Sequence, residues 1–332
     1  MKKTKNQAVT IVALTIVLSA LALASADAAQ WNATVGAQSR DKGNQALAFL
    51  PNEIWIHAGD QITWMFDADD IHTLTFLTAD QPRPFFADGC PGFSTDPATY
   101  DGSTCVTTPP MVSGQTFTVI FPVAGNFKLV CLVHENMTAV VHVFDLVETL
   151  PHDQAFYNRQ AAGQRLELLL NANQLLLNAN RHAHGHRSQG NAVTAGIGSV
   201  TAKAGGSNTV SVMRFSDHTI QIHAGETVEW DNQDPITPHT ITFGTEPVGD
   251  PEPPSPDVTV DHDGARHAII DSTADSTHSG FIIAAPQERL GLPQAPLGVT
   301  RFRVTFPNAG TFPYICALHD DLGMTGTVIV RP

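Results

Sequence analysis

Basic residues are scarce in this sequence. Its 332 residues include 18 Lys and Arg against 32 Asp and Glu, which gives a formal net charge of -14 with neutral histidines. Nucleic acid is an unsuitable partner for so acidic a chain, because its phosphates are bound by clustered cations. The charge favours redox protein partners with a cationic patch, although acidity also serves solubility alone.

The sequence also lacks the motifs of common organic cofactors and of covalent catalysis. It contains no phosphate-cradling glycine loop, no dinucleotide fingerprint and no recognisable Ser/His/Asp arrangement. We therefore predict no organic cofactor site and no catalytic residues of these kinds. With 42% hydrophobic residues, the chain still has enough apolar side chains for the cores of about two domains.

The longest hydrophobic run lies near the N-terminus. Lys2, Lys3 and Lys5 precede an apolar run over residues 8–24, which is followed by Ala-Asp-Ala at 26–28. This layout predicts a secretory signal peptide over residues 1–28, cleaved after Ala28. An uncleaved anchor is the alternative, because the run is long for a signal core and just short of a membrane span. Either reading places the later residues in the periplasm or outside the cell, with no membrane span left after cleavage.

Cysteine is rare, and its four positions fall into two groups. Cys131 opens the segment CLVHENM at 131–137, and Cys316 opens CALHDDLGM at 316–324. Cys90 and Cys105 remain, and they flank a segment rich in Gly, Pro, Asp and Thr. In an oxidising compartment we predict that these two form a disulfide, which closes a loop of about 15 residues.

The chain repeats itself. IHAGDQITW at 56–64 recurs as IHAGETVEW at 222–230, HTLTF at 72–76 recurs as HTITF at 239–243, and FPVAGNFKLVCLVH at 121–134 recurs as FPNAGTFPYICALH at 306–319. A repeat of this length indicates a duplicated domain, since solenoid units span about 20 to 50 residues. Within each copy, short segments of Val, Ile, Thr and Phe separated by turn residues predict a β-sandwich.

The segment between the copies has a different composition. Residues 152–180 include RLELLLNANQLLLNAN, which predicts a helix whose leucines pack on the sandwiches or on a neighbouring subunit of an oligomer. RHAHGHRSQG at 181–190 predicts a flexible linker, whose His182, His184 and His186 form either a weak Cu(II) site or a solvated spacer. The predicted organisation is a first domain at 29–147, a helix and linker at 148–190, and a second domain at 191–332. Loops are expected in the insertion at 246–296.

Each copy supplies the donor set of a particular metal centre. The candidate ligands are His72, Cys131, His134 and Met137 in the first copy, and His239, Cys316, His319 and Met324 in the second. Two imidazoles and a thiolate in a plane, with a long and weak axial thioether, suit type 1 copper. Zinc also binds Cys and His, but a thioether in place of a second thiolate or a carboxylate favours copper.

With these motifs, the two copies resemble cupredoxins, the blue copper family of plastocyanin, amicyanin and azurin, over about residues 30–147 and 191–332. CALHDDLGM is similar to the plastocyanin ligand loop, and CLVHENM resembles the shorter amicyanin loop. The resemblance implies an all-β fold of two tandem Greek-key β-sandwich domains joined by an α-helical linker. It also implies two type 1 copper ions per chain, one-electron transfer between redox partners, and an exposed edge of His134 or His319 as the electron port.

Other functions stay open. Two-domain relatives of cupredoxins include nitrite reductases and small laccases, which carry histidines beside the type 1 cysteine. Here Cys131 lies between Val130 and Leu132, and Cys316 lies between Ile315 and Ala317. We therefore favour an electron carrier over a copper oxidase or nitrite reductase, with copper storage or delivery as a third reading. We expect the remaining histidines singled out by the pattern to lie at the surface: His57, His223, His262, His267 and His278.

Overall fold

The computed structural model describes residues 28–185, 191–249, 253–284 and 299–332, and for residues 180–185 it describes the backbone only. The predicted signal peptide lies outside the described residues, apart from Ala28 at its end. The same holds for parts of the predicted insertion at 246–296.

The first half of the chain folds into a β-sandwich. Its strands are β1 (Gln30–Gln38), β2 (Asn44–Leu50), β3 (Glu53–His57), β4 (Gln61–Phe66), β5 (Thr75–Phe76), β6 (Ala98–Thr99), β7 (Val106–Thr107), β8 (Thr116–Ile120), β9 (Gly125–Val130) and β10 (Thr138–Phe144). One layer has the order β2-β1-β4-β8-β6, and the other has the order β3-β10-β9-β5-β7. Inward side chains of both layers meet in a single core, for example Trp64 of β4 and Val141 of β10.

The second half repeats this sandwich. Its strands are β11 (Asn191–Lys203), β12 (Gly206–Phe215), β13 (Thr219–His223), β14 (Thr227–Gln233), β15 (Thr242–Phe243), β16 (Thr259–Val260), β17 (Arg266–Ile269), β18 (Thr277–His278), β19 (Arg301–Thr305), β20 (Gly310–Ile315) and β21 (Thr325–Arg331). The predicted fold of two β-sandwiches with a helix between them is confirmed. The insertion is not made of loops alone, because it contributes β16, β17 and β18 to the sheets.

Matching aromatic side chains fill the two cores. Trp64 packs against Phe76 with ring centroids 5.9 Å apart, and Trp230 packs against Phe243 at 5.8 Å. Both tryptophans lie on strands whose alternate residues point inward, as the burial of Ile62 and Val228 beside them shows. Alternation of apolar and polar residues therefore fixes the same register in both copies.

The two sandwiches are joined through their edge strands. β2 pairs with β12 in antiparallel fashion, so the two facing layers merge into one sheet of 11 strands. Gln45 and Ser211, which occupy equivalent positions in the two repeats, are partners in this pairing. The junction therefore has approximate two-fold symmetry, and each sandwich covers the edge that the other would leave open.

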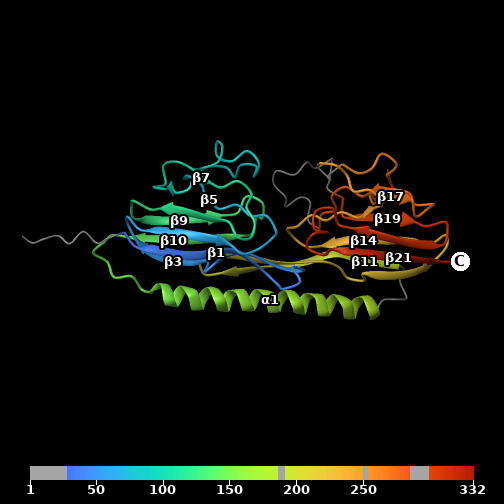
Figure 1. Ribbon diagram of the computed structural model, residues 1–332, viewed down its shortest axis with the longest axis horizontal. Helices are drawn as coiled ribbons and strands as arrows, with labels where there is room; N and C mark the ends of the chain where they lie inside the picture. The colour runs from blue at the N-terminus through green and yellow to red at the C-terminus, as the bar shows by residue number, and fades with distance from the viewer. Residues whose placement is uncertain (1–27, 186–190, 250–252, 285–298) are drawn as a thin grey trace, which may run out of the picture.

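A long helix covers this junction. α1 (Gln154–Gly185) runs beneath both sandwiches along the long axis of the molecule (Figure 1). Asp153 caps its start, because its Oδ1 accepts the N–H of Phe156 at 2.8 Å. The helix continues to residue 185, so the predicted flexible linker is wrong for residues 181–185.

The helix and the junction share a third hydrophobic core. Its buried members come from β1, β2, β11, β12 and α1, and they are Ala37, Ala46, Ala48, Leu50, Leu168, Ala172, Ile197, Val210 and Val212. Hydrogen bonds tie the helix to both halves, from Asn44 to Asn173 at 2.7 Å and from Asn171 to Ser199 at 3.1 Å. The leucines of α1 thus pack on the sandwiches, as one of the two predicted alternatives required.

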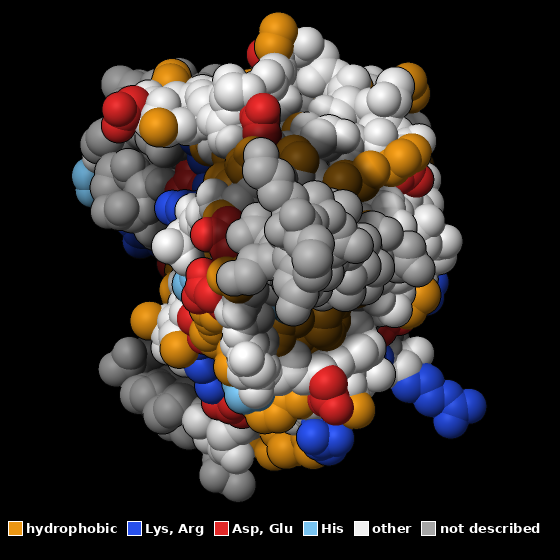
Figure 2. Space-filling view, turned by 90° about the vertical axis from the view of Figure 1, so that its left-hand side faces the viewer, with side chains coloured by type: hydrophobic (Ala, Val, Ile, Leu, Met, Phe, Trp, Pro, Cys, Tyr) orange, Lys and Arg blue, Asp and Glu red, His pale blue; other side chains and the backbone are white. Residues whose placement is uncertain are grey.

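The surface of the molecule carries exposed leucines from α1 and a mixture of side-chain types at the end formed by the first sandwich. Leu166, Leu170 and Leu177 are exposed. On the end formed by the first sandwich, Figure 2 shows acidic side chains intermingled with hydrophobic and basic ones. In the part of the chain that the structure describes, no helix has the length and apolar character needed to cross a membrane.

The third core predicts a stability difference between two leucines of α1. Leu168 is buried and Leu170 is 57% exposed. We expect Leu168→Ala to lower the free energy of unfolding by about 2–5 kcal/mol, because it leaves a cavity under the junction. Leu170→Ala should change it by no more than about 0.5 kcal/mol. Urea denaturation followed by circular dichroism compares the two variants, and equal shifts would show that α1 does not stabilise the junction.

Candidate metal centres

Six buried side chains form two clusters of potential metal ligands. The first contains His72, Cys131 and His134, and the second contains His239, Cys316 and His319. Within each cluster one ligand atom per residue lies within 4.8 Å of the others. These are the histidines and cysteines that the repeated sequence motifs predicted.

In the first cluster the donor atoms converge from two segments of the chain. Nδ1 of His72 lies 3.1 Å from Nδ1 of His134, which in turn lies 3.8 Å from Sγ of Cys131. His72 is held by an isolated β-bridge to Met111, and Cys131 directly follows β9. The ends of two packed segments thus fix the cluster before any ion binds.

The second cluster has the same construction. Sγ of Cys316 lies 3.8 Å from Nδ1 of His239 and 3.4 Å from Nδ1 of His319. His239 forms a β-bridge with Ile282, and Cys316 directly follows β20. The duplication has therefore preserved the placement of the donors as well as their identity.

The predicted axial methionines close each ligand loop. The amide of Cys131 donates to the carbonyl of Met137 at 3.0 Å, and the amide of Cys316 donates to that of Met324 at the same distance. Both methionines are fully buried. The first loop returns to the sheet after Met137 through β10, and the second returns after Met324 through β21.

A threonine after the upstream histidine supports each cysteine. The amide of Thr73 lies 3.4 Å from Sγ of Cys131, and the amide of Thr240 lies 3.3 Å from Sγ of Cys316. Each threonine hydroxyl also accepts the amide that follows the cysteine, at 2.7 Å in both copies. These N–H groups favour a thiolate. Sequence analysis missed these threonines, although the repeated HT dipeptide was the signal.

A glycine leaves room for each upstream histidine. Gly36 and Gly196 have φ angles of +70° and +78°, and a Cβ atom there would lie 2.6 Å and 2.0 Å from Nε2 of His72 and His239 respectively. Only glycine combines this backbone conformation with so close an approach. Sequence analysis missed this pair as well.

Burial controls protonation in both clusters. Desolvation lowers the pKa of His72 and that of His319 to about 3, so these imidazoles are neutral and can offer a lone pair. Desolvation also raises the pKa of Cys131, and it raises that of Cys316 to about 11. A bound cation reverses the preference of the thiols, because a coordinating thiol is deprotonated outright.

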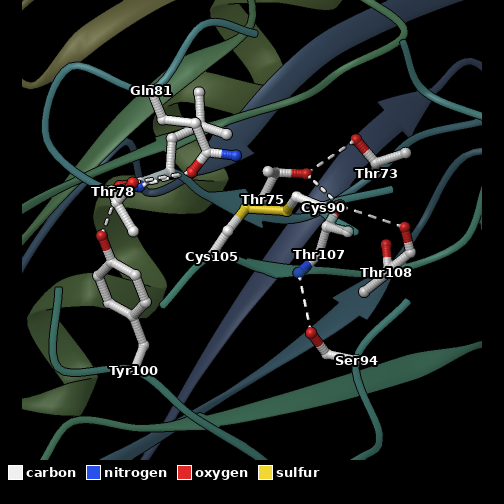
Figure 3. The surroundings of a disulfide bond; sticks show 11 residues. Thr73, Thr75, Thr78, Gln81, Cys90, Ser94, Tyr100, Cys105, Thr107 and Thr108 are labelled. Atoms are coloured by element: carbon white, nitrogen blue, oxygen red, sulfur yellow. Dashed lines mark hydrogen bonds between the residues drawn. A yellow bond between two sulfur atoms is a disulfide. The ribbon is translucent and has the colours of Figure 1, made fainter. Parts of the chain in front are cut away.

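The region around a disulfide is connected to the first cluster by hydrogen bonds. The predicted disulfide between Cys90 and Cys105 is present, with Cα atoms 5.9 Å apart. A row of buried hydroxyls connects this region to the cluster, from Thr107 through Thr75 to Thr73 (Figure 3). Arg83, in the loop before the disulfide, donates to the carbonyls of Cys131 and Glu135. The disulfide-bonded region thus contacts the first ligand loop.

A buried carboxylate also lies against the first cluster. Oδ2 of Asp70 is 3.4 Å from Nε2 of His134. Burial raises the pKa of Asp70 to about 7, and the carboxylates Asp234 and Asp321 of the second sandwich contribute in the same direction. His134 and His319 are only 3% and 6% exposed. The predicted exposed histidine edge is therefore wrong, because neighbouring side chains cover both rings.

Strand β12 of the second sandwich links both ligand loops to the junction. The hydroxyl of Thr138, just after the first loop, accepts the amide of Ser207 on β12 at 2.9 Å. Arg214, also on β12, donates to the carbonyl of Leu322 in the second loop and to that of Asp41 in the first sandwich. Both clusters therefore lie near the junction of the two sandwiches.

The other histidines singled out in the sequence do not join these clusters. His57 and His223 lie at strand ends and bond to backbone carbonyls. His262 is exposed as predicted, and His267 is partly buried beside Asp261 at 3.2 Å. His278 is buried, so the prediction of exposure is wrong for it. The structure describes no side chain for His182 or His184, and His186 lies outside the described residues.

The donor set and its spacing suit a copper ion. One ion bound to nitrogens at about 2.0 Å and to a thiolate at about 2.3 Å keeps such donors about 3 to 4 Å apart. The observed separations of 3.1 to 3.8 Å fall in this range. Two imidazoles, one thiolate and a loop-closing methionine are the combination found at blue-copper sites.

One comparison with known proteins agrees with this chemistry. Residues 200–331 match the family model for copper binding proteins of the plastocyanin/azurin family. Similar solved structures include a reduced Cu(I) form at pH 4 of one amicyanin mutant and the reduced state of another, each 16% identical. Each alignment covers 35% of this chain and 82% of the amicyanin chain, with a TM-score of 0.24.

The matched range contains the whole second cluster, and the first sandwich repeats its fold and its donors. The predicted resemblance to cupredoxins is supported for the second sandwich, which matches the plastocyanin/azurin family of copper binding proteins over residues 200–331.

Proposed function

We propose that the protein carries single electrons between redox partners and holds two type 1 copper ions per chain. The proposed ligands are His72, Cys131, His134 and Met137 for one ion and His239, Cys316, His319 and Met324 for the other. The observation that carries the proposal is the duplicated cluster of one thiol and two imidazoles. Both clusters are buried, lie at equivalent strand ends and receive the same threonine contacts.

Copper bound at such a site would supply a one-electron redox couple, Cu(II)/Cu(I). The protein's part is to keep the donor atoms in nearly the same places in both states. His72 and His239 are fixed by β-bridges, while Thr73 and Thr240 hold the cysteine sulfurs. A preformed set of ligands moves little on electron transfer, which favours rapid exchange.

The proposed setting is the periplasm or the cell exterior. The signal-like N-terminus and the disulfide between Cys90 and Cys105 support this location. The net charge of -14 supports brief encounters with partners that carry cationic patches, in a salt-dependent manner. An oligomer that uses the exposed leucines of α1 remains part of the proposal.

The alternatives require features other than these clusters. A copper oxidase or nitrite reductase needs a further copper site, but several other described histidines are engaged by protein groups. His57 bonds to the carbonyl of Glu148, and His142 lies 3.1 Å from Glu53. A storage or delivery protein needs ready access to its metal, whereas the histidine and cysteine donors are all less than 10% exposed. An electron carrier is the function that burial of the ligands supports best.

Copper loading should reveal two independent blue centres. We expect about two Cu(II) ions per chain, intense visible absorption from thiolate charge transfer and narrow copper hyperfine splitting. Cys131→Ser should abolish the signal of the first centre and keep that of the second, while Cys316→Ser should do the reverse. Metal analysis with visible and electron paramagnetic resonance spectroscopy measures this, and loss of both signals in either variant would contradict two independent centres.

Turnover assays separate the carrier from the enzymes. The copper-loaded protein should accept and donate one electron per centre but should not turn over nitrite, or a phenol with dioxygen. The variant with both Cys131→Ser and Cys316→Ser is the matched control for adventitious copper. Sustained turnover by the wild type that this variant lacks would overturn the carrier proposal in favour of a copper oxidoreductase.

A further inference from the structure

We infer that Asp70 is a positioning residue for His134, and that it gives the first metal centre a support that the second centre lacks. The inference rests on the proposed function, because it concerns how the first cluster would hold copper. It follows from three observations. Asp70 contacts the ring of His134, it belongs to the segment that supplies the other histidine ligand, and a different residue occupies the equivalent position of the second sandwich.

The first observation is which side of the ring Asp70 faces. Nδ1 of His134 points toward Cys131 and His72, while Nε2 on the other side lies 3.4 Å from Oδ2 of Asp70. A carboxylate that accepts the Nε2 proton fixes the tautomer with a lone pair on Nδ1. Oδ2 of Asp70 is buried and has no hydrogen-bond partner among the described residues, so it is available to accept the Nε2 proton and to orient the ring for binding through Nδ1.

The second observation is how Asp70 is held. Its side chain is nearly buried, and its Oδ1 accepts the amide of Ile71 at 2.8 Å. Asp70 precedes His72 by two residues, so it belongs to the segment that supplies the upstream ligand. The contact with His134 thus joins the two ligand segments directly, on the side of the cluster away from the sulfur.

The third observation is the difference between the two copies. When His72 is matched with His239, the position of Asp70 corresponds to Thr237. The hydroxyl of Thr237 lies 3.1 Å from that of Ser211 on β12. In the described part of the chain, no carboxylate forms an ion pair with His319, the counterpart of His134. The two copies have the same ligands but different partners for the downstream histidine.

This difference has a chemical consequence for the first centre. A carboxylate bonded to the far nitrogen makes an imidazole a more basic ligand, and partners of this kind typically account for 10-fold to 100-fold in metal affinity. The effect favours the more highly charged Cu(II) over Cu(I). Arg83 donates to the carbonyls of Cys131 and Glu135, and its positive charge there favours Cu(I) over Cu(II). Asp70 is therefore expected to lower the reduction potential of the first centre relative to the same centre without it.

The test uses Asp70→Asn in the full-length Cys316→Ser protein, where only the first centre can be blue. We expect the affinity for Cu(II) to fall by about 10-fold to 100-fold and the reduction potential to rise. Asp69→Asn is the matched control, because it removes a neighbouring carboxylate that pairs with Lys42 at 2.7 Å and not with His134. Asp70→Asn in the Cys131→Ser protein should leave the second centre unchanged.

A second measurement uses the protein that keeps Asp70, so its result does not depend on whether the Asp70→Asn variant folds. Nitrogen-15 NMR of the metal-free and Cu(I)-loaded protein should show a proton on Nε2 of His134. An unprotonated Nε2, or equal Cu(II) affinity for Asp70→Asn and Asp69→Asn, would overturn the role of Asp70. Failure of the wild type to bind copper at either centre would instead overturn the proposed function.

Discussion

The pairing of β2 with β12 is the interaction on which the rest of the structure depends. An isolated sandwich of either kind would leave a long edge strand open, with unpaired N–H and C=O groups. Here each open edge covers the other, and the merged sheet gives α1 a continuous surface on which to pack. The helix is therefore not a tether between independent domains but a component of a shared core.

The junction also affects the chemistry of the clusters. Since β12 contacts both ligand loops, through Ser207 to Thr138 and through Arg214 to Leu322, the second half supports the first site as well as its own. The carboxylates Asp234 and Asp321 influence Asp70 across the same boundary. Two copies of one domain have become a single unit whose sites have different surroundings.

Burial connects the stability of each site with its function. Six donors lie out of water in the two cores, where neutral imidazoles are favoured and an uncompensated thiolate is not. Backbone amides of Thr73 and Thr240 offset part of that cost, and a bound cation offsets the remainder. The same packing covers the rings of His134 and His319, so neither ring offers an exposed edge at the surface.

The sequence by itself determined the duplication, the sandwich class, the disulfide and the identity of the donors in each cluster. These features depend on residue type and on short-range sequence pattern, and the strand pattern and the donors appear in both copies. Only the tertiary structure decided the junction, the length of α1, and the contact of Asp70 with His134. β2 reads as Asn-Gln-Ala-Leu-Ala-Phe-Leu yet is buried at every position, because its partners β1, β12 and α1 come from distant parts of the chain. Long-range pairing of this kind leaves no local pattern, so it becomes visible only when the chain is folded.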